Sequence, residues 1–124
     1  MKTYLKLNDI SAYKKSLSLS NYVWGIVLTW DKFARDTVGK QFVRAIDSIS
    51  ANIAEGFGRY TKKDKINFYR ISFGSIKESF DWNEKPKSRK MLRQAEYNSN
   101  LRELSDKPRE DKTLISFTNE RLQK

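Results

Sequence analysis

Residues 42–60, FVRAIDSISANIAEGFGRY, contain the pattern that decides the fold. Along this stretch and just before it, apolar side chains recur every three or four residues, at Val38, Phe42, Ile46, Ile49, Ile53 and Phe57. That spacing places them on one face of an α-helix, which turns once every 3.6 residues. We therefore expect an amphipathic helix over residues 37–57, with Asp36 or Thr37 as its N-terminal cap.

Two glycines, Gly56 and Gly58, lie at the end of this stretch. Glycine reaches the left-handed conformation with which many helices end, so we interpret the pair as a stop signal. A phosphate-binding loop would need a preceding strand and a Lys-Ser/Thr pair, and residues 56–63, GFGRYTKK, have neither.

The same spacing recurs in three other parts of the chain. It predicts helices over residues 9–32, 62–85 and 93–122. No linker-like or repeated segment separates them. We expect an all-α fold in which residues 1–124 form a single domain of antiparallel packed helices.

Local signals mark where these helices begin and end. Asn8 or Asp9 is positioned to cap the first helix, and Thr61 with Asp64 forms a T-x-x-D pattern close to a capping box before the third. Pro86 lacks an amide hydrogen and disfavours helical geometry in the residue before it. We therefore expect the third helix to end or kink within the two residues before this proline.

The last helix contains a second proline. Residues 105–111, SDKPRED, interrupt its apolar face. We expect Ser105 or Asp106 to cap a renewed helical segment that Pro108 opens.

The amino-acid composition argues against several classes of function. The 124 residues include no Cys and no His, so the commonest general base and the commonest transition-metal ligand are both missing. We expect no enzymatic activity, no metal and no cofactor.

The longest apolar-rich stretch, residues 22–30, is far shorter than the ~20 residues that span a bilayer. We therefore expect a cytoplasmic protein with no membrane partner.

Basic residues are in excess and clustered. Lys and Arg number 25 and Asp and Glu 15, for a net charge of +10. Residues 59–70 hold five bases and one acid, and residues 85–93 hold five bases and no acid. This pattern favours a polyanionic partner, RNA or DNA, held through its phosphates. The expected nucleic-acid-binding residues are Arg59, Tyr60, Lys62, Lys63, Lys65, Arg70, Lys85, Lys87, Arg89, Lys90 and Arg93.

Three of these bases, Lys62, Lys63 and Lys65, lie in the first turns of an expected helix, where the helix dipole disfavours cations. A bound phosphate would explain their position, and Tyr60 is placed to stack on an unpaired base. Two alternatives stay open: a merely solvated surface, and docking to an acidic protein.

A polar stripe flanks the apolar face of the helix over residues 37–57. Gln41, Ser48, Asn52 and Glu55 follow one another at intervals of 7, 4 and 3. We expect a structural polar network of Arg44, Ser48, Asn52 and Glu55, with Arg44 or Arg70 as the counter-charge of Glu55. On the next helix, Ser72, Ser75 and Ser79 suit close helix packing better than nucleophilic chemistry.

Residues 42–60 and residues 68–79, FYRISFGSIKES, strongly resemble the bacterial four-helix-bundle family named for proteins encoded in intervening sequences of 23S ribosomal RNA genes. Residues 114–122, LISFTNERL, are also similar to it. The most specific part is the pattern R-A-x-x-S-I-x-x-N-I-A-E-G-x-G-R. It falls on Arg44, Ala45, Ser48, Ile49, Asn52, Ile53, Ala54, Glu55, Gly56, Gly58 and Arg59.

The resemblance implies an up-down-up-down four-helix bundle that associates as a ring-shaped homopentamer. It also implies kinship with accessory proteins of diversity-generating retroelements, which bind nucleic acid and a reverse transcriptase through a basic surface. We therefore expect a non-enzymatic, oligomeric nucleic-acid-binding protein, accessory to rRNA intervening sequences or to a reverse transcriptase. The alternatives are an oligomeric scaffold that binds no nucleic acid and a metal-dependent hydrolase that uses Glu55.

Overall fold

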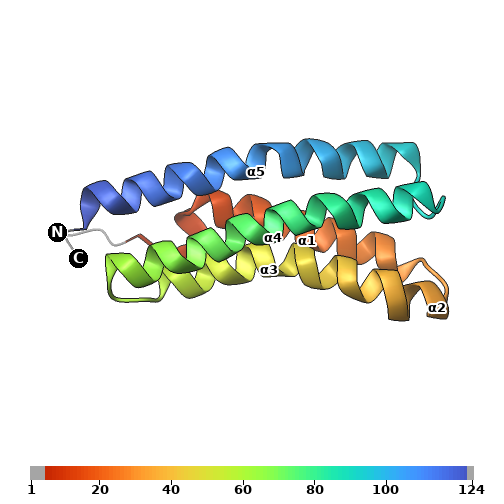
Figure 1. Cartoon of the computed structure of the whole chain (residues 1–124), viewed down its shortest axis with the longest axis horizontal. Helices are drawn as coiled ribbons and strands as arrows, with labels where there is room; N and C mark the ends of the chain where they lie inside the picture. Colours follow the sequence, from red (N-terminus) through yellow and green to blue (C-terminus); the bar gives the residue numbers. More distant parts are fainter. Residues whose placement is uncertain (1–4, 123–124) are drawn as a thin grey trace.

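The computed structural model describes residues 5–122, and every regular element in that range is helical. Four long helices make up most of it: α1 (Ser11–Leu28), α3 (Lys40–Phe57), α4 (Lys62–Ser88) and α5 (Gln94–Arg121). They lie side by side as a helical bundle (Figure 1). The expected all-α class is confirmed.

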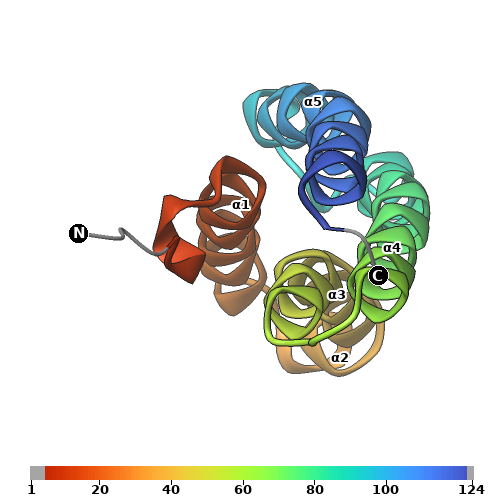
Figure 2. The same ribbon diagram turned by 90° about the vertical axis from the view of Figure 1, so that its left-hand side faces the viewer.

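Helix α3 is central to the packing. It contacts α1 on one side and α4 on the other, and α4 also contacts α5. The contact between α1 and α5 is smaller, and the end-on view shows a gap between their ribbons (Figure 2). The loop between α3 and α4 lies at the same end of the bundle as the last turn of α5, whereas the loop between α4 and α5 lies at the opposite end (Figure 1).

The apolar stripe of α3 forms the centre of the core, as its spacing predicts. Phe42, Ile46, Ile49 and Ile53 are completely buried. The other three long helices each contribute apolar side chains to the same cluster, among them Leu19, Val23, Ile76 and Leu104. Burying such side chains is the main favourable contribution to folding, at roughly 25 cal/mol per Å² of apolar surface.

The start of α3 differs from the prediction. A short helix α2 (Lys32–Ala34) and a π-helical segment η2 (Arg35–Gly39) lead into α3 without a break. Neither Asp36 nor Thr37 is a cap. The cap is Asp31, whose Oδ1 accepts a hydrogen bond from the amide three residues later at 2.9 Å.

The predicted cap of α1 is also wrong. Residues Leu7–Asp9 form a single 3₁₀ turn, η1, and α1 begins after Ile10, which makes no side-chain capping bond. Asp9 instead stabilises the 3₁₀ turn, because its Oδ2 accepts a hydrogen bond from the Lys6 amide at 2.8 Å. The helix is therefore shorter than the expected residues 9–32.

Helix α4 begins as the sequence predicts. Thr61 is the cap, and its Oγ1 accepts a hydrogen bond from the Asp64 amide at 3.1 Å. This bond satisfies one of the amides that the first helical turn leaves without an intrahelical acceptor.

Pro86 does not end α4, which continues to Ser88. The proline is buried, and its carbonyl accepts a hydrogen bond from the Met91 amide at 2.8 Å. Lys90 has a φ of 59° and donates its amide to the Lys87 carbonyl at 3.2 Å. The two bonds form a Schellman motif, so a left-handed lysine, rather than the proline, terminates the helix.

Pro108 does not divide α5, which is continuous from Gln94 to Arg121. A proline inside a helix removes one hydrogen bond, here to the Leu104 carbonyl. Ser105, expected as a cap, donates its hydroxyl to the Leu101 carbonyl at 2.7 Å within the helix. Packing of α5 along α4 offsets the lost bond.

Gly56 has a different role from the one its position suggested. No glycine in residues 5–122 has a positive φ, and Gly58, the C-terminal cap of α3, has a φ of −79°. Gly56 is buried against α4, and a Cβ atom there would lie 2.6 Å from Cε1 of Tyr69 and 3.0 Å from the Lys65 carbonyl oxygen. Glycine is required because the two helices approach too closely for a side chain.

The interface between α4 and α5 is polar inside. Asn100 donates its amide to Oδ1 of Asn83 at 3.0 Å, and both side chains are buried. Farther along α5, Lys107 is completely buried, with its Nζ 3.3 Å from Oε1 of Glu110 and 3.7 Å from Oε1 of Glu103. Asp111 is buried one turn later.

Burial raises the pKa of Asp111 to about 6, because desolvation disfavours the charged carboxylate. The nearby Glu110 also raises this pKa, while the nearby Lys107 lowers it. A group whose pKa is higher in the folded protein contributes stability below its unfolded pKa of 3.8. That contribution is lost as the pH rises through about 6.

We predict that Gly56→Ala destabilises the protein by about 1–3 kcal/mol, because the added methyl group overlaps the Tyr69 ring. Gly74→Ala in α4 is the matched control: a Cβ there meets no atom within 4 Å, so it should stabilise the helix by about 0.5–1 kcal/mol. Urea unfolding measures both. Equal effects of the two substitutions would contradict the close approach of α3 and α4.

We predict that Asp111→Asn stabilises the protein above pH 7, by up to about 3 kcal/mol, because it removes a buried carboxylate that is ionised there. The difference from the wild type should shrink as the pH falls through 6 toward 4, where Asp111 is protonated in the folded protein. Urea unfolding at pH 4.5, 6 and 7.5, chosen to bracket this pKa, measures the trend. A difference that does not vary with pH would refute it.

Candidate nucleic-acid interface

The first basic cluster lies at the α3–α4 end of the bundle, but two of its five bases have structural partners. Arg59 donates from Nη2 to Oε1 of Glu55 at 2.6 Å, and its guanidinium lies 4.6 Å from the centre of the Phe68 ring. This ion pair also corrects the expected network, because the counter-charge of Glu55 is Arg59 rather than Arg44 or Arg70.

Lys65 points inward rather than toward solvent. Its Nζ donates to the Phe57 carbonyl at 2.7 Å and to the Gly56 carbonyl at 3.4 Å, at the C-terminal end of α3. Burial lowers its pKa. A cation at a helix C-terminus is favourable, so the position of Lys65 near the start of α4 is explained by the end of the neighbouring helix.

The other members of this cluster are available for a ligand. Lys63 and Arg70 are exposed and Lys62 is half-buried, and none of the three forms an ion pair within residues 5–122. Tyr60 is 97% exposed beside them. We call Tyr60, Lys62, Lys63 and Arg70 the α3–α4 patch. It places one aromatic ring and two cations at the start of α4 and a third cation about two turns farther along the helix.

The second basic cluster lies at the other end of α4 and is more strongly engaged within the protein. Lys85 pairs with Asp81 and lies 4.5 Å from the centre of the Trp82 ring. Arg93 pairs with Glu96 at 3.1 Å. The remaining three bases contribute less to packing: Lys87 lies 5.7 Å from the centre of the Tyr97 ring, and Arg89 and Lys90 are exposed.

The two clusters do not form one surface. Helix α4, which separates them, has 27 residues and therefore a length of about 40 Å at 1.5 Å per residue. The two loops that carry the clusters lie at opposite ends of the bundle (Figure 1). One protomer thus offers two separate basic ends.

The structure brings together only part of the expected polar network. Asn52 donates its Nδ2 to the Ser48 carbonyl at 2.8 Å and to Ser48 Oγ at 2.9 Å, and Ser48 Oγ lies 2.8 Å from Oγ of Ser75. These bonds link α3 to α4. Glu55 is occupied by Arg59, and Arg44 is exposed and takes no part in the bonds found within residues 5–122.

The serines of α4 serve packing. Ser72 donates its hydroxyl across to the Ile49 carbonyl at 3.1 Å, and Ser79 donates to the Ser75 carbonyl at 2.7 Å.

Within residues 5–122, no group of three or more acidic side chains is arranged to hold a metal ion. No helix in that range is long and apolar enough to cross a membrane.

Sequence reasoning missed two features of α5. One is the buried charge of Lys107 and Asp111. A signal was present, because these residues follow Leu104 at intervals of three and four and so continue its inward-facing stripe across the apparent interruption.

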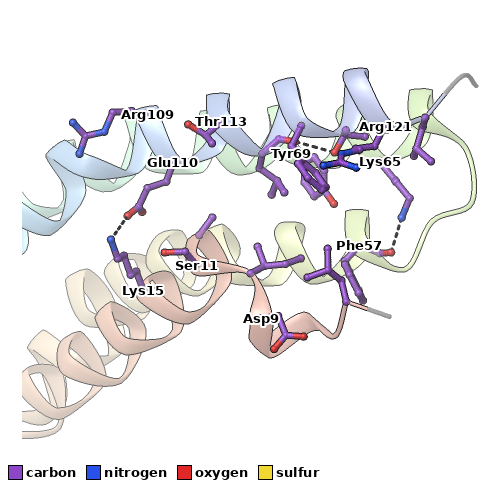
Figure 3. Close-up of a pocket in the computed structure, with 17 residues that line it drawn as sticks. Asp9, Ser11, Lys15, Phe57, Lys65, Tyr69, Arg109, Glu110, Thr113 and Arg121 are labelled. Carbon is purple, nitrogen blue, oxygen red and sulfur yellow. Dashed lines mark hydrogen bonds and ion pairs between the residues drawn. The ribbon is translucent and has the colours of Figure 1, made fainter. Parts of the chain in front are cut away.

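The second missed feature is a cavity of about 500 Å³ between the start of α1 and the end of α5 (Figure 3). No local pattern could have found it, since its walls come from all four long helices and from residues just before α1 and just after α5. It lies at the same end of the bundle as the α3–α4 patch, and Lys65 and Phe57 line it.

The comparison with protein families matches residues 8–108 to the family described as 23S rRNA-intervening sequence protein. The chain belongs to this family. The match covers α1, α3 and α4, and ends within α5. The resemblance seen in residues 42–60 is therefore confirmed.

A solved structure supports the fold. A crystal structure from Bacteroides thetaiotaomicron, described as a protein with unknown function from the S23 ribosomal protein family, matches with a TM-score of 0.74. It is 22% identical, and the match covers 84% of this chain and 97% of the other. No curated protein matches the chain.

We predict that Lys65→Met lowers stability by about 1 kcal/mol, because the C-terminal carbonyls of α3 lose their cationic donor while the aliphatic packing is largely retained. Lys63→Met, which removes an exposed ammonium that makes no such bond, should change stability by less than about 0.5 kcal/mol. Urea unfolding of the two variants tests the assignment. Equal stability would show that Lys65 does not cap α3.

Proposed function

We propose that this member of the family binds RNA or DNA through phosphate contacts, without enzymatic activity. The observation that carries the proposal is the α3–α4 patch: three cations that form no ion pair within the described chain, next to a tyrosine that is almost fully exposed. Exposed cations without carboxylate partners can release counterions from a nucleic-acid backbone.

The start of α4 adds to this preference for phosphate. Thr61 satisfies the amides of Asp64 and Lys65 through its Oγ1 and its carbonyl. The amides of Lys62 and Lys63 lie ahead of them in the first turn, where helices leave their donors to external acceptors. Tyr60 supplies a flat surface on which an unpaired base can stack.

We further propose that the four helices run in antiparallel, up-down-up-down order and that protomers associate, in a ring of five by the family resemblance. Exposed apolar side chains on α1 and α2 support association: Leu17, Trp24, Leu28 and Phe33. Association would gather several basic ends into one larger field. Sedimentation equilibrium measures how many protomers associate.

The family resemblance is the basis for proposing which nucleic acid the protein accompanies in the cell. We propose an accessory role in the cytoplasm, beside rRNA intervening sequences or a reverse transcriptase. The alternative is an oligomeric scaffold that binds no nucleic acid, which the exposed apolar side chains of α1 would equally serve.

We predict that reversing the three cations of the α3–α4 patch, with Lys62→Glu, Lys63→Glu and Arg70→Glu together, weakens binding to RNA and DNA at least tenfold. It should also reduce the slope of log K against log salt by about 2–3, as expected for the loss of three phosphate contacts. Fluorescence anisotropy with single-stranded and duplex oligonucleotides at several salt concentrations measures both quantities.

The matched control reverses three exposed bases outside both clusters, Lys14, Lys40 and Arg102, and so changes the net charge by the same amount. It should leave most of the affinity and the salt slope intact. Equal losses in the two triple variants would show that only net charge matters. A wild-type protein without a steep salt dependence would favour the scaffold alternative.

A further inference from the structure

The cavity between α1 and α5 has the size of a small-molecule site. Its volume of about 500 Å³ falls within the range of roughly 300–1,000 Å³ typical of ligand pockets. The cavity is open to solvent on one side and lies where α1 and α5 make only a small contact.

The walls of the cavity are mainly apolar. Side chains from the start of α1, the end of α3 and the end of α5 surround it, among them Ile10, Phe57, Leu114, Phe117 and Leu122. Filling such a space with an apolar group removes both the ligand and the wall from water. The body of a ligand that fits here is therefore apolar.

One side of the cavity is cationic. Lys65 and Arg121 both line it, and neither forms an ion pair with a carboxylate in residues 5–122. Figure 3 shows the two side chains on the same side of the cavity, near Tyr69. The desolvation that lowers the pKa of Lys65 would be relieved by a nearby anion.

Tyr69 provides a hydrogen-bond donor at the same place. The residue is only 2% exposed and lines the cavity, yet its hydroxyl has no hydrogen-bond partner among the described residues. The hydroxyl is not among the enclosed polar atoms of the protein, so it is open to the cavity that the residue lines. Burial raises the pKa of Tyr69 to about 12, so the hydroxyl keeps its proton and can donate it in a hydrogen bond at neutral pH.

Three of the four other charged groups around the cavity are in ion pairs. Lys15 lies 3.2 Å from Oε2 of Glu110, and Arg109 lies 3.6 Å from Oδ1 of Asp106. Asp9 accepts the Lys6 amide. Lys65 and Arg121 thus have no carboxylate partner and Asp9 has no cation partner among the ion pairs of residues 5–122, which leaves the lining with an excess of positive charge that favours an anion.

We propose that this cavity binds a free amphipathic anion, with an apolar chain or ring among the α1 and α5 side chains and a single anionic head group at Lys65, Tyr69 and Arg121. The head group accepts hydrogen bonds from the phenol and the guanidinium, and the ammonium of Lys65 keeps its bonds to α3. This site is separate from the α3–α4 patch, and its occupancy does not depend on nucleic-acid binding.

Isothermal titration with dodecanoate, kept below its micelle concentration, tests the proposal. Dodecanoate should bind saturably with one molecule per protomer. Dodecylammonium, with the same chain and the opposite charge, and acetate, which has the head group alone, should each bind at least tenfold more weakly. Equal affinity for the two dodecyl compounds, or no saturable binding of dodecanoate, would overturn the proposal.

Variants locate the bound molecule. Tyr69→Phe keeps the ring against Gly56 and should weaken dodecanoate about tenfold, as should Arg121→Gln. Thr113→Trp, from an exposed lining position, should fill the cavity and abolish binding. Arg102→Gln, which removes an exposed charge outside the cavity, should leave the affinity unchanged. Circular dichroism checks that each variant is folded. Unchanged affinity in folded Tyr69→Phe and Thr113→Trp would place the ligand elsewhere.

Discussion

The contact between Tyr69 and Gly56 sets how closely α3 and α4 approach each other at the end of the bundle that carries the α3–α4 patch and the cavity. Because α3 has no side chain at Gly56, α4 approaches closely and the Tyr69 ring is buried in the interface. The approach brings Lys65 to the last carbonyls of α3 and directs the phenol toward the cavity. The same geometry determines where the loop that carries Tyr60 leaves the bundle.

The interface between α4 and α5 buries polar and charged side chains, unlike the apolar core around α3. A chain that is 38% hydrophobic still buries a lysine, an aspartate and two asparagines between these helices. Burying such a group costs desolvation free energy, which a bound partner offsets. Removing the partner of a buried charge destabilises the folded protein by several kcal/mol. A slip of α5 along α4 would separate Asn83 from Asn100 and from the Tyr97 carbonyl, to which the Asn83 amide donates at 3.3 Å. These asparagine bonds therefore favour one register of α5, while α3 supplies most of the apolar stabilisation.

The basic side chains at the two ends of α4 have different surroundings. Cations gather at both ends of α4, and their roles differ with their neighbours. Those at the α4–α5 loop mostly pair with acids or lie over aromatic rings, whereas the α3–α4 patch stays without acidic partners in the described chain. The same end of the bundle also contains the cavity. The α3–α4 end thus has two chemically different surfaces, an exposed cationic one that we propose for phosphates and an apolar cavity that we propose for an amphipathic anion.

Sequence alone determined the helical class, the inward stripe of α3, the Thr61 cap and, through a long motif, the family. These features depend on neighbours within one or two helical turns, which spacing reports directly. Only the tertiary structure decided that both prolines lie inside helices, that Gly56 serves close packing and that Lys65 points inward. It alone also revealed the cavity. The physical reason is that each of these outcomes depends on atoms of another helix, whose distance no local pattern encodes.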